Sequence, residues 1–196
     1  MIPRYTRKEA EKIWTLENKY KIWCEIECLI ADKLSLLGTI PKDASKNIRK
    51  KIKFNVSEIE KIEKITKHDV VAYIQNVSKY LGDDAKYFHY GVTSSDIIDT
   101  TFSILLKESS EIIIKDIKKL LKEIKLKAIK YKNTIMMGRS HGIHAEPITF
   151  GLKLATFYSE FERNLKRLEI VKENISICSI SGPVGTYNSI DPRVEE

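Results

Sequence analysis

Residues 95–133 read SDIIDTTFSILLKESSEIIIKDIKKLLKEIKLKAIKYKN, and they contain neither proline nor glycine. The apolar residues of this stretch recur at helical spacing, and they include Ile98, Leu105, Ile112, Leu120, Ile124 and Ile129. The pattern predicts one continuous α-helix, which at about 1.5 Å per residue would be roughly 55 to 60 Å long. Because so long a helix must pack against others, we expect partner helices within the chain and in neighbouring subunits.

Helical spacing extends over nearly all of the chain, and no run of alternating apolar and polar residues predicts a strand hairpin. We expect a first helix over residues 6–38, opened by a capping box at its first four residues and blocked beyond its end by Pro41. A second capping box at residues 57–60 opens a short helical segment, and Asp69 is the expected N-cap of the next helix. Further helices are predicted over residues 42–51, 70–81 and about 149–174. The chain is therefore assigned to the all-α class.

The composition is that of an ordinary soluble protein, with 42% hydrophobic and 31% charged residues among 196. Charges interrupt every apolar stretch well short of the ~20 residues that cross a bilayer, so we expect no membrane segment. Residues 1–9 lack the apolar core and the cleavage site of a secretory signal. These features predict a cytoplasmic protein.

The cysteines and the net charge both allow more than one interpretation. Cys24 and Cys28 would share a helix face beside Trp23 as buried thiols, whereas a zinc site would need two more soft ligands nearby. The net charge of +7 would suit nucleic acid or an anionic small molecule. The basic residues are spread along helices and interleaved with glutamates, which is also typical of a solvated face.

The residues Thr93, Ser94 and Ser95 stand at the start of the longest predicted helix. Free backbone N–H groups, hydroxyl groups and the positive end of the helix dipole favour an anion at such a place, so a carboxylate is the expected ligand. The alternative is that Ser94 or Ser95 only caps the helix.

A polar loop is predicted at residues 138–147, where two glycines and a proline break the helical pattern. His141 lies there with Arg139 and Ser140 beside it, which suits a general acid or base that a substrate must reach. The alternative is a surface or structural histidine.

The same loop contains a His-x-x-His pattern that resembles a metal site. It is formed by His141 and His144, with Glu146 close by. Gly142 and Pro147 oppose the helix that usually presents such ligands, so no metal is expected here.

Lys67, His68 and Asp69 place a cation, a titratable ring and a carboxylate in succession at a helix start. A carboxylate beside His68 favours the charged ring, which can bind a phosphate or a developing anion. Alternatively, Asp69 is only an N-cap with exposed neighbours. The first helix is preceded by Arg4 and Tyr5. These two side chains would bind a phosphate, or alternatively they are ordinary surface residues.

Five segments together resemble the adenylosuccinate lyases of the fumarase and aspartase superfamily. In chain order they are residues 3–5 (PRY), 67–72 (KHDVVA), 89–96 (HYGVTSSD), 138–147 (GRSHGIHAEP) and 181–187 (SGPVGTY). The amino-acid sequence of the histidine loop is the specific signal, because argininosuccinate lyases, fumarases and muconate cycloisomerases have a different sequence there.

The resemblance implies β-elimination of fumarate from adenylosuccinate, which gives AMP, and from succinylaminoimidazole carboxamide ribotide, in purine biosynthesis. His141 would be the general acid that protonates the departing nitrogen, and His68 would assist. The implied substrate-binding residues are Arg4 and Tyr5 for the nucleotide, Lys67, His68 and Asp69 for the phosphate and the substrate's charge, and Thr93 and Ser94 for succinyl carboxylate oxygens. The implied neighbours of the site are His89, Ser95, Arg139 and Ser140. No metal and no organic cofactor are implied.

The resemblance also implies a homotetramer in which several subunits assemble each active site around a central bundle of long helices. Residues 1–92 would form an N-terminal helical domain, and residues 93–196 would form the first part of the bundle domain. The family's proton-abstracting serine lies on a loop beyond residue 196, together with a lysine and an asparagine that bind substrate. We therefore expect the chain to be inactive by itself.

Three other functions fit parts of the sequence. A non-catalytic helical assembly module would keep the fold without affinity for AMP, which a titration detects. A nucleic-acid binder would rest on the net charge of +7 and the lysines of residues 115–132, and its binding would depend steeply on salt. Another lyase of the superfamily would be recognised by its substrate.

Overall fold

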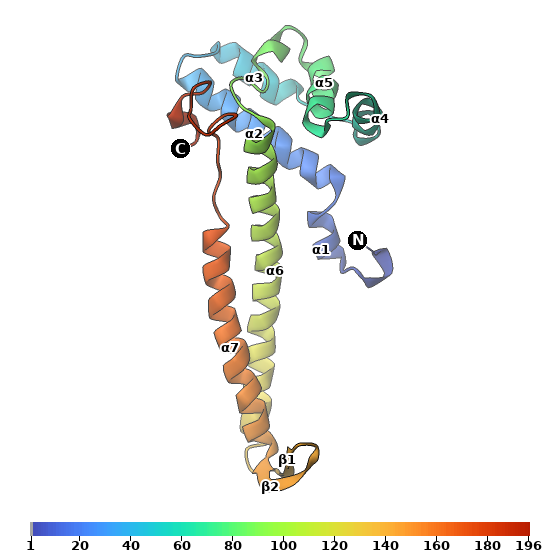
Figure 1. The fold of residues 1–196 in the computed structure, drawn as a ribbon, viewed down its shortest axis with the longest axis vertical. Coiled ribbons are helices and arrows are strands. Elements are labelled where there is room, and N and C mark those ends of the chain that lie inside the picture. Colours follow the sequence, from blue (N-terminus) through green and yellow to red (C-terminus); the bar gives the residue numbers. More distant parts are fainter. Residues whose placement is uncertain (1) are drawn as a thin grey trace. The chain divides into compact units, whose positions relative to one another are not determined.

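The structure is a computed structural model that describes residues 2–196. The chain divides into two compact units, of which unit 1 comprises Met1–Leu105 with Ile177–Glu196 and unit 2 comprises Leu106–Ser176. Helices dominate both units, and one two-stranded sheet is present in unit 2 (Figure 1). The predicted helical class is confirmed, with that small sheet as an addition. None of the helices within residues 2–196 combines the length and the apolar composition that crossing a bilayer requires.

Unit 1 contains a layer of short helices around α2. Its complete helices are α1 (Lys8–Ile13), α2 (Leu16–Leu36), α3 (Lys42–Lys51), α4 (Val56–Thr66) and α5 (Asp69–Leu81), with 3-10 turns at η1 (Pro3–Tyr5), η2 (Gly82–Tyr87) and η3 (Pro192–Val194). The long helix α6 (Ser94–Lys130) begins in unit 1 and continues into unit 2. The prediction for residues 42–51 is confirmed at both ends, and those for residues 70–81 and for the long uninterrupted helix are confirmed to within three residues at each end.

The single helix predicted over residues 6–38 is wrong, because the chain breaks between α1 and α2. The Thr15 side chain accepts a hydrogen bond from the Asn18 backbone N–H at 3.1 Å and so starts a new helix. The Asn18 side chain donates to the Ile13 carbonyl at 2.9 Å, which closes the preceding helix. Local side-chain bonds of this kind compete with a continuous helical backbone.

Both predicted capping boxes are wrong as well. The Thr6 hydroxyl donates to the Ile2 carbonyl at 2.8 Å instead of capping α1. Asn55 caps α4, since its side-chain oxygen accepts from the Glu58 N–H at 3.0 Å, and Ser57 lies inside the helix. Asparagine is among the preferred N-cap residues, so the register is chemically ordinary but shifted by two positions.

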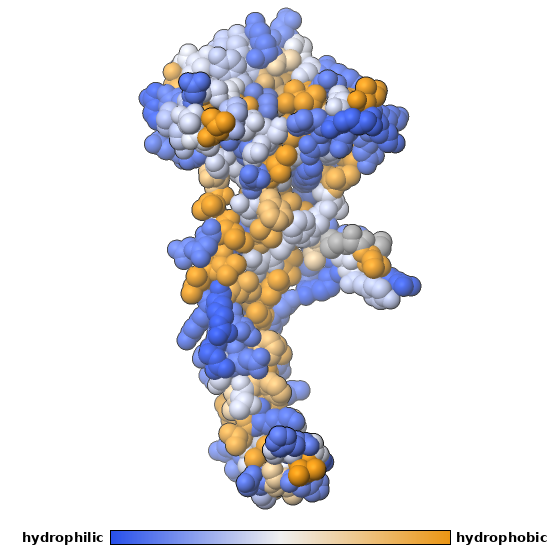
Figure 2. All heavy atoms as spheres, viewed as in Figure 1, coloured by the Kyte–Doolittle hydropathy of each residue, from blue (hydrophilic) through white to orange (hydrophobic). Residues whose placement is uncertain are grey.

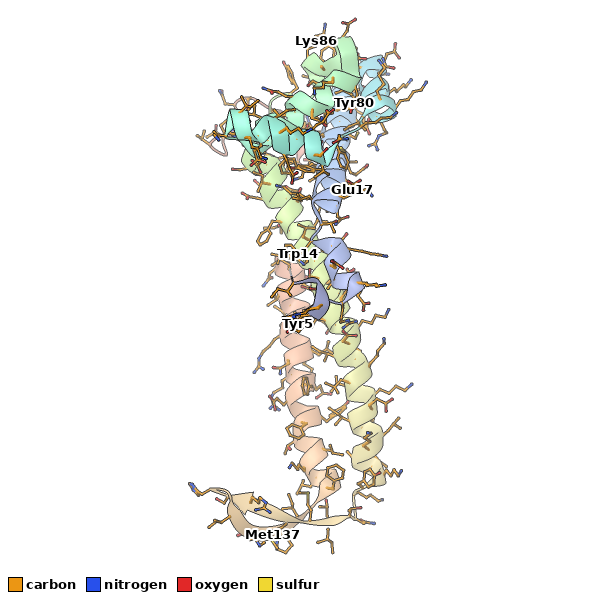
Figure 3. The ribbon with its side chains drawn as sticks, turned by 90° about the vertical axis from the view of Figure 1, so that its right-hand side faces the viewer. Tyr5, Trp14, Glu17, Tyr80, Lys86 and Met137 are labelled. Carbon is orange, nitrogen blue, oxygen red and sulfur yellow. The ribbon has the colours of Figure 1, made fainter. Side chains whose placement is uncertain are left out.

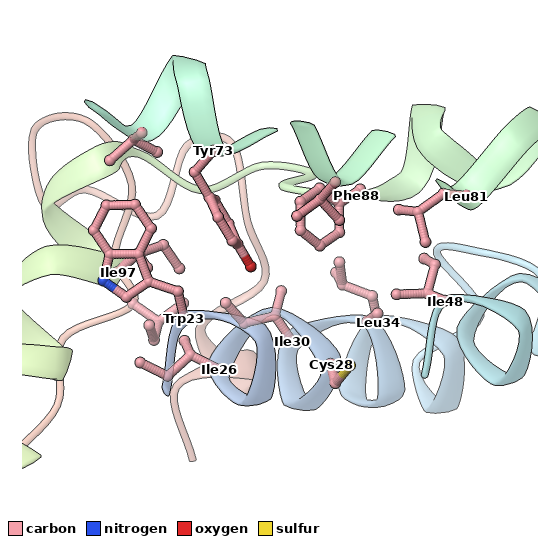
Figure 4. Packing of buried hydrophobic residues seen from close by; sticks show 14 of the residues in the cluster. Trp23, Ile26, Cys28, Ile30, Leu34, Ile48, Tyr73, Leu81, Phe88 and Ile97 are labelled. Atoms are coloured by element: carbon pink, nitrogen blue, oxygen red, sulfur yellow. The ribbon is translucent and has the colours of Figure 1, made fainter. Parts of the chain in front are cut away.

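The core of unit 1 is built on α2 and closed by α5. Tyr20, Trp23 and Tyr73 are almost completely buried, and their ring centroids lie 5.0 to 5.8 Å apart. Figure 4 shows this cluster continuing through aliphatic side chains of α2 and α3. Burial raises the pKa of the Cys24 thiol to about 11 and that of Cys28 to about 12, so both remain protonated thiols at neutral pH.

A buried carboxylate joins the start of α6 to the C-terminal segment of unit 1. Asp96 is 3% exposed, and it accepts hydrogen bonds from the backbone N–H groups of Thr93 (2.9 Å), Ser181 (3.0 Å) and Gly182 (3.1 Å). Nearby, the Ser189 hydroxyl donates to the Gly91 carbonyl at 2.7 Å. Residues far apart in sequence are thereby fixed around one turn.

We expect Asp96→Asn to destabilise unit 1. The amide offers one acceptor oxygen where the carboxylate offers two, so at least one of the three backbone N–H groups loses its partner, at a cost of roughly 2 kcal/mol. Urea unfolding should show this loss, and hydrogen exchange should accelerate at Ser181 or Gly182. Asp99→Asn, at an exposed position of the same helix, is the matched control. Equal stability of the two variants would contradict the role given to Asp96.

Unit 2 is a pair of helices joined by a β-hairpin. Strands β1 (Ile135–Ser140) and β2 (Ile143–Thr149) are antiparallel, and α7 (Phe150–Asn174) follows directly (Figure 1). The Thr149 side chain caps α7 by accepting from the Leu152 N–H at 3.1 Å, as the predicted start at residue 149 requires. The loop predicted over residues 138–147 is instead this hairpin. A bulge at Gly138 and a proline in β2 had obscured the strand pattern.

The helices of unit 2 approach each other closely at the hairpin end. A methyl group on Gly151 would lie 2.5 Å from the backbone of Ala128 and Lys132, so only glycine allows this contact. Two ion pairs, Lys118–Glu169 at 2.9 Å and Lys172–Glu111 at 3.1 Å, connect the helices further along.

Much of the apolar surface of unit 2 is nevertheless uncovered. Within residues 106–176, all of which the structure describes, Leu121 is the only buried large hydrophobic residue. Exposed large apolar residues of α6 and α7 include Ile113, Leu120, Leu126, Ile129, Leu152, Phe157, Ile170 and Val171. Figure 2 shows apolar surface along both helices. Exposed apolar faces of this kind are typical of interaction surfaces.

Candidate active site

A strained junction between α4 and α5 carries the first group of predicted site residues. Lys67 ends α4 in the left-handed conformation, with a φ of 56°. His68 follows in extended conformation, and its Nδ1 accepts from the Val71 N–H at 3.4 Å. The N-cap of α5 is therefore His68, and the prediction that Asp69 caps this helix is wrong.

The cap bond defines what the His68 ring can offer. Because Nδ1 accepts a backbone hydrogen bond, a neutral His68 carries its proton on Nε2. The side chain is 46% exposed, so that Nε2–H group is available to an anion. His68 therefore suits the phosphate or substrate charge predicted for it.

Asp69 lies between the ammonium group of Lys19 and the imidazole ring of His68. Its Oδ1 is 3.7 Å from His68 Nδ1, and its Oδ2 is 3.3 Å from Lys19 Nζ. Lys19 also lies over the Trp23 ring, 4.4 Å from the centroid. Sequence reasoning missed Lys19, because fifty residues separate it from Asp69 and no local pattern connects them.

The turn before α6 carries the second group. The first helical residue is Ser94, so neither Ser94 nor Ser95 holds the N-cap position, which falls to Thr93. Asp96 completes half of a capping box by accepting from the Thr93 N–H. Thr93 and Ser94 are half-buried and Ser95 is exposed, at the positive end of the longest helix.

His89 lies in the same turn with a φ of 58°, also left-handed. Its Nδ1 is 2.6 Å from Oε1 of Glu27, a residue of α2 that is 1% exposed. From the sequence, His89 is predicted only as a neighbour of the site. Glu27 is not predicted at all, because its local sequence resembles that of any polar residue in an amphipathic helix.

His141 occupies the tip of the hairpin. With φ values of 50° and 78°, His141 and Gly142 form a two-residue connection in which both residues are left-handed. Such turns favour asparagine or glycine at the first position, so histidine is unusual there. Arg139 donates to the Gly142 carbonyl at 3.4 Å, and Ser140 pairs with Ile143, so the turn presents an exposed imidazole on a fixed backbone.

Arg4 and Tyr5 lie in η1 at the surface of unit 1. The Arg4 guanidinium stacks over the Tyr5 ring at 4.8 Å, and Figure 3 labels Tyr5. Unit 1 thus carries Arg4, Tyr5, Lys67, His68, Asp69, His89, Thr93, Ser94 and Ser95, whereas unit 2 carries Arg139, Ser140 and His141.

Left-handed backbone conformations coincide with the predicted site. Four described residues other than glycine have a positive φ, and they are Lys67, His89, His141 and Tyr187. Three of the four are predicted site residues. Strained backbone of this kind persists where function requires a particular side chain.

Comparisons with known proteins identify the family of the chain. A model of the lyase family matches residues 4–196. The chain belongs to the lyase family. The family match places the chain in the fumarase and aspartase superfamily and confirms the resemblance seen in the motifs.

The relatives of the lyase chain include enzymes with several substrates. Adenylosuccinate lyase of Bacillus subtilis (strain 168) is 48% identical over all 196 residues, which cover 46% of that relative. A fumarate lyase from Mesorhizobium sp. BNC1 superposes with a TM-score of 0.90 at 27% identity, over 97% of this chain and 48% of that one. The 3-carboxy-cis,cis-muconate lactonizing enzyme of Pseudomonas putida shares the fold, with a TM-score of 0.88 at 21% identity over 94% of this chain and 44% of that one. The lyase chain spans about half the length of the curated relative it matches.

We expect Lys67→Gly to raise the free energy of unfolding by up to about 1 kcal/mol, because glycine adopts the left-handed conformation without steric cost. Lys64→Gly, at an exposed helical position of α4, should lower it by roughly 1 kcal/mol. Urea titrations of both variants measure the difference. If both variants lose stability equally, Lys67 is not strained.

Proposed function

We propose that the chain is the N-terminal portion of an adenylosuccinate lyase, which eliminates fumarate from adenylosuccinate and from succinylaminoimidazole carboxamide ribotide. The observation that carries this proposal is the 48% identity over all 196 residues to the Bacillus subtilis enzyme. The left-handed conformations of His89, His141 and Lys67 support it, since they hold three predicted site residues at a cost to stability.

The chemistry requires an acid for the departing nitrogen. In a β-elimination, a base removes the proton on the carbon next to a carboxylate, and the C–N bond then breaks. His141 is the proposed general acid, and its exposure at the tip of a two-residue turn supports this role. The proposed base lies in the part of the enzyme beyond residue 196, as the family resemblance implies.

The same reaction requires donors for the substrate's anionic groups. The developing carbanion delocalises into the adjacent carboxylate, and donors that are already in place stabilise that charge. Thr93 and Ser94, at the start of α6, are the proposed ligands of the succinyl carboxylate. The phosphate and the substrate charge would be bound by Lys67 and His68, with Asp69. The nucleotide would be bound by Arg4 with Tyr5. The residues that border the site would be Ser95, His89, Arg139 and Ser140.

The partners in this proposal are the nucleotide substrate and further copies of the chain. The exposed apolar faces of α6 and α7 support association into an oligomer, a tetramer in the complete enzyme. Each active site would then combine residues from several copies, so the proposed site does not require unit 1 and unit 2 residues to meet within one chain. The boundary between residues 92 and 93 stays a prediction.

The proposal includes neither nucleic acid nor a membrane as a partner, and it needs no metal or organic cofactor. The cytoplasm is the proposed compartment. Free thiols at Cys24, Cys28 and Cys178 are compatible with the reducing conditions found there.

Adenylosuccinate cleavage, followed by ultraviolet absorbance, tests the proposal. The chain is assayed alone and after mixing with the C-terminal remainder of the Bacillus subtilis relative, a combination called the reconstituted mixture below. We expect activity only in the reconstituted mixture. His141→Asn should lower kcat by roughly 10²- to 10⁴-fold, because the general acid is lost.

Asparagine tolerates the left-handed conformation, so His141→Asn should leave the hairpin intact. His144→Asn, at an exposed position of β2, is the matched control and should retain most of the activity. An inert mixture that is folded and assembled would contradict the proposed function. Full activity of His141→Asn would contradict the role of His141.

A further inference from the structure

Glu27 is a buried acidic residue with an incomplete set of partners. Its side chain is 1% exposed in the middle of α2, and Oε1 lies 2.6 Å from His89 Nδ1. Oε2 is buried and has no hydrogen-bond partner among residues 2–196. Burying a carboxylate costs stability unless its oxygens are hydrogen-bonded, so folding alone does not explain a glutamate here.

The partner residue is held in a conformation that also costs stability. His89 is left-handed, with a φ of 58°, and its side chain is 15% exposed. On one side, Phe88 is buried against Tyr73 with ring centroids 5.9 Å apart. On the other side, Ser189 binds the carbonyl of Gly91. The turn is therefore fixed by its neighbours, and the ring of His89 is fixed by Glu27.

The hydrogen bond to Glu27 determines which ring nitrogen is available. A carboxylate only accepts hydrogen bonds, so His89 carries a proton on Nδ1. Nε2 lies on the other side of the imidazole and is not engaged by Glu27. To bind an anionic oxygen, Nε2 must also donate a proton, and the ring would then have an acceptor at each nitrogen, Glu27 at Nδ1 and the anion at Nε2. A buried carboxylate that holds the Nδ1–H of a histidine is the arrangement that orients catalytic imidazoles in serine hydrolases.

The location of His89 connects this pair with the proposed site. His89 lies in the turn that leads into Thr93 and Ser94, the proposed ligands of the succinyl carboxylate. The backbone of that turn is bound by Asp96 and Ser189. A displaced His89 ring therefore changes the surroundings of bound substrate without releasing the turn.

We propose that Glu27 is a positioning residue that holds His89 with Nδ1–H turned inward, so that Nε2 binds an anionic oxygen of the substrate. This inference rests on the proposed function for its substrate, and on the geometry of unit 1 for the pair itself. Glu27 acts only through His89 and does not touch the substrate.

The pair is tested first in the 196-residue chain by nitrogen-15 NMR of the histidine rings. We expect a slowly exchanging Nδ1–H signal from His89, which disappears in Glu27→Ala and persists in Glu27→Gln, whose amide oxygen still accepts. Glu25→Gln is the matched control, because Glu25 is exposed on the same helix and pairs with Arg49 at 3.2 Å. The proposed hydrogen bond between His89 and Glu27 is overturned if the His89 ring carries its only proton on Nε2, or if its signals are unchanged in Glu27→Ala.

Kinetics of the reconstituted mixture then test whether the Glu27–His89 pair contributes to substrate binding. Glu27→Ala should raise KM for adenylosuccinate by about tenfold, as expected when a charge-assisted hydrogen bond is lost, and Glu27→Gln should restore part of the loss. A purely structural role would reduce the amount of folded protein and leave KM unchanged. Unchanged KM in both variants, with an active wild-type mixture, overturns the positioning role. An inert wild-type mixture contradicts the proposed function instead, and the NMR result still decides whether the pair exists.

Discussion

The carboxylate of Asp96 is the constraint on which the arrangement of unit 1 depends. Three backbone N–H groups from two distant segments converge on it in a buried environment. Removing a carboxylate from water is unfavourable, and complete hydrogen bonding offsets that cost only when both segments are in place. The start of α6, the turn that carries His89 and the segment beginning at Ser181 are consequently ordered together.

Around that constraint, the chain accepts strain where chemistry is expected. His89 and His141 adopt a conformation that glycine or asparagine would adopt more readily, and Lys67 does the same at the end of α4. Each left-handed residue costs of order 1 kcal/mol or more, so the packed core must compensate. The core can do so because Tyr20, Trp23 and Tyr73 bury large aromatic surfaces in mutual contact.

The sequence predicted the structural features that depend on residues within one or two helical turns, and it predicted few others. The long helix and the helix of residues 42–51 follow from spacing and from the placement of proline and glycine. The hairpin was missed because His-Gly is not the usual signal for such a turn, and the break at Thr15 was missed because a local cap outweighed an unbroken apolar stripe. Two residues that contact predicted site residues, Lys19 and Glu27, do so across 50 and 62 positions of the chain, and no local sequence pattern indicates contacts over such separations.

In the proposed enzyme, residues of unit 1 and unit 2 act together in sites formed between copies of the chain. The most direct measurement mixes two variants, Thr93→Ala and His141→Asn, each of which we expect to be inactive when assembled alone with the C-terminal remainder. Co-assembly of the two variants should restore adenylosuccinate cleavage, because some sites then combine an intact Thr93 from one copy with an intact His141 from another. A co-assembled mixture that stays inactive would contradict this proposal.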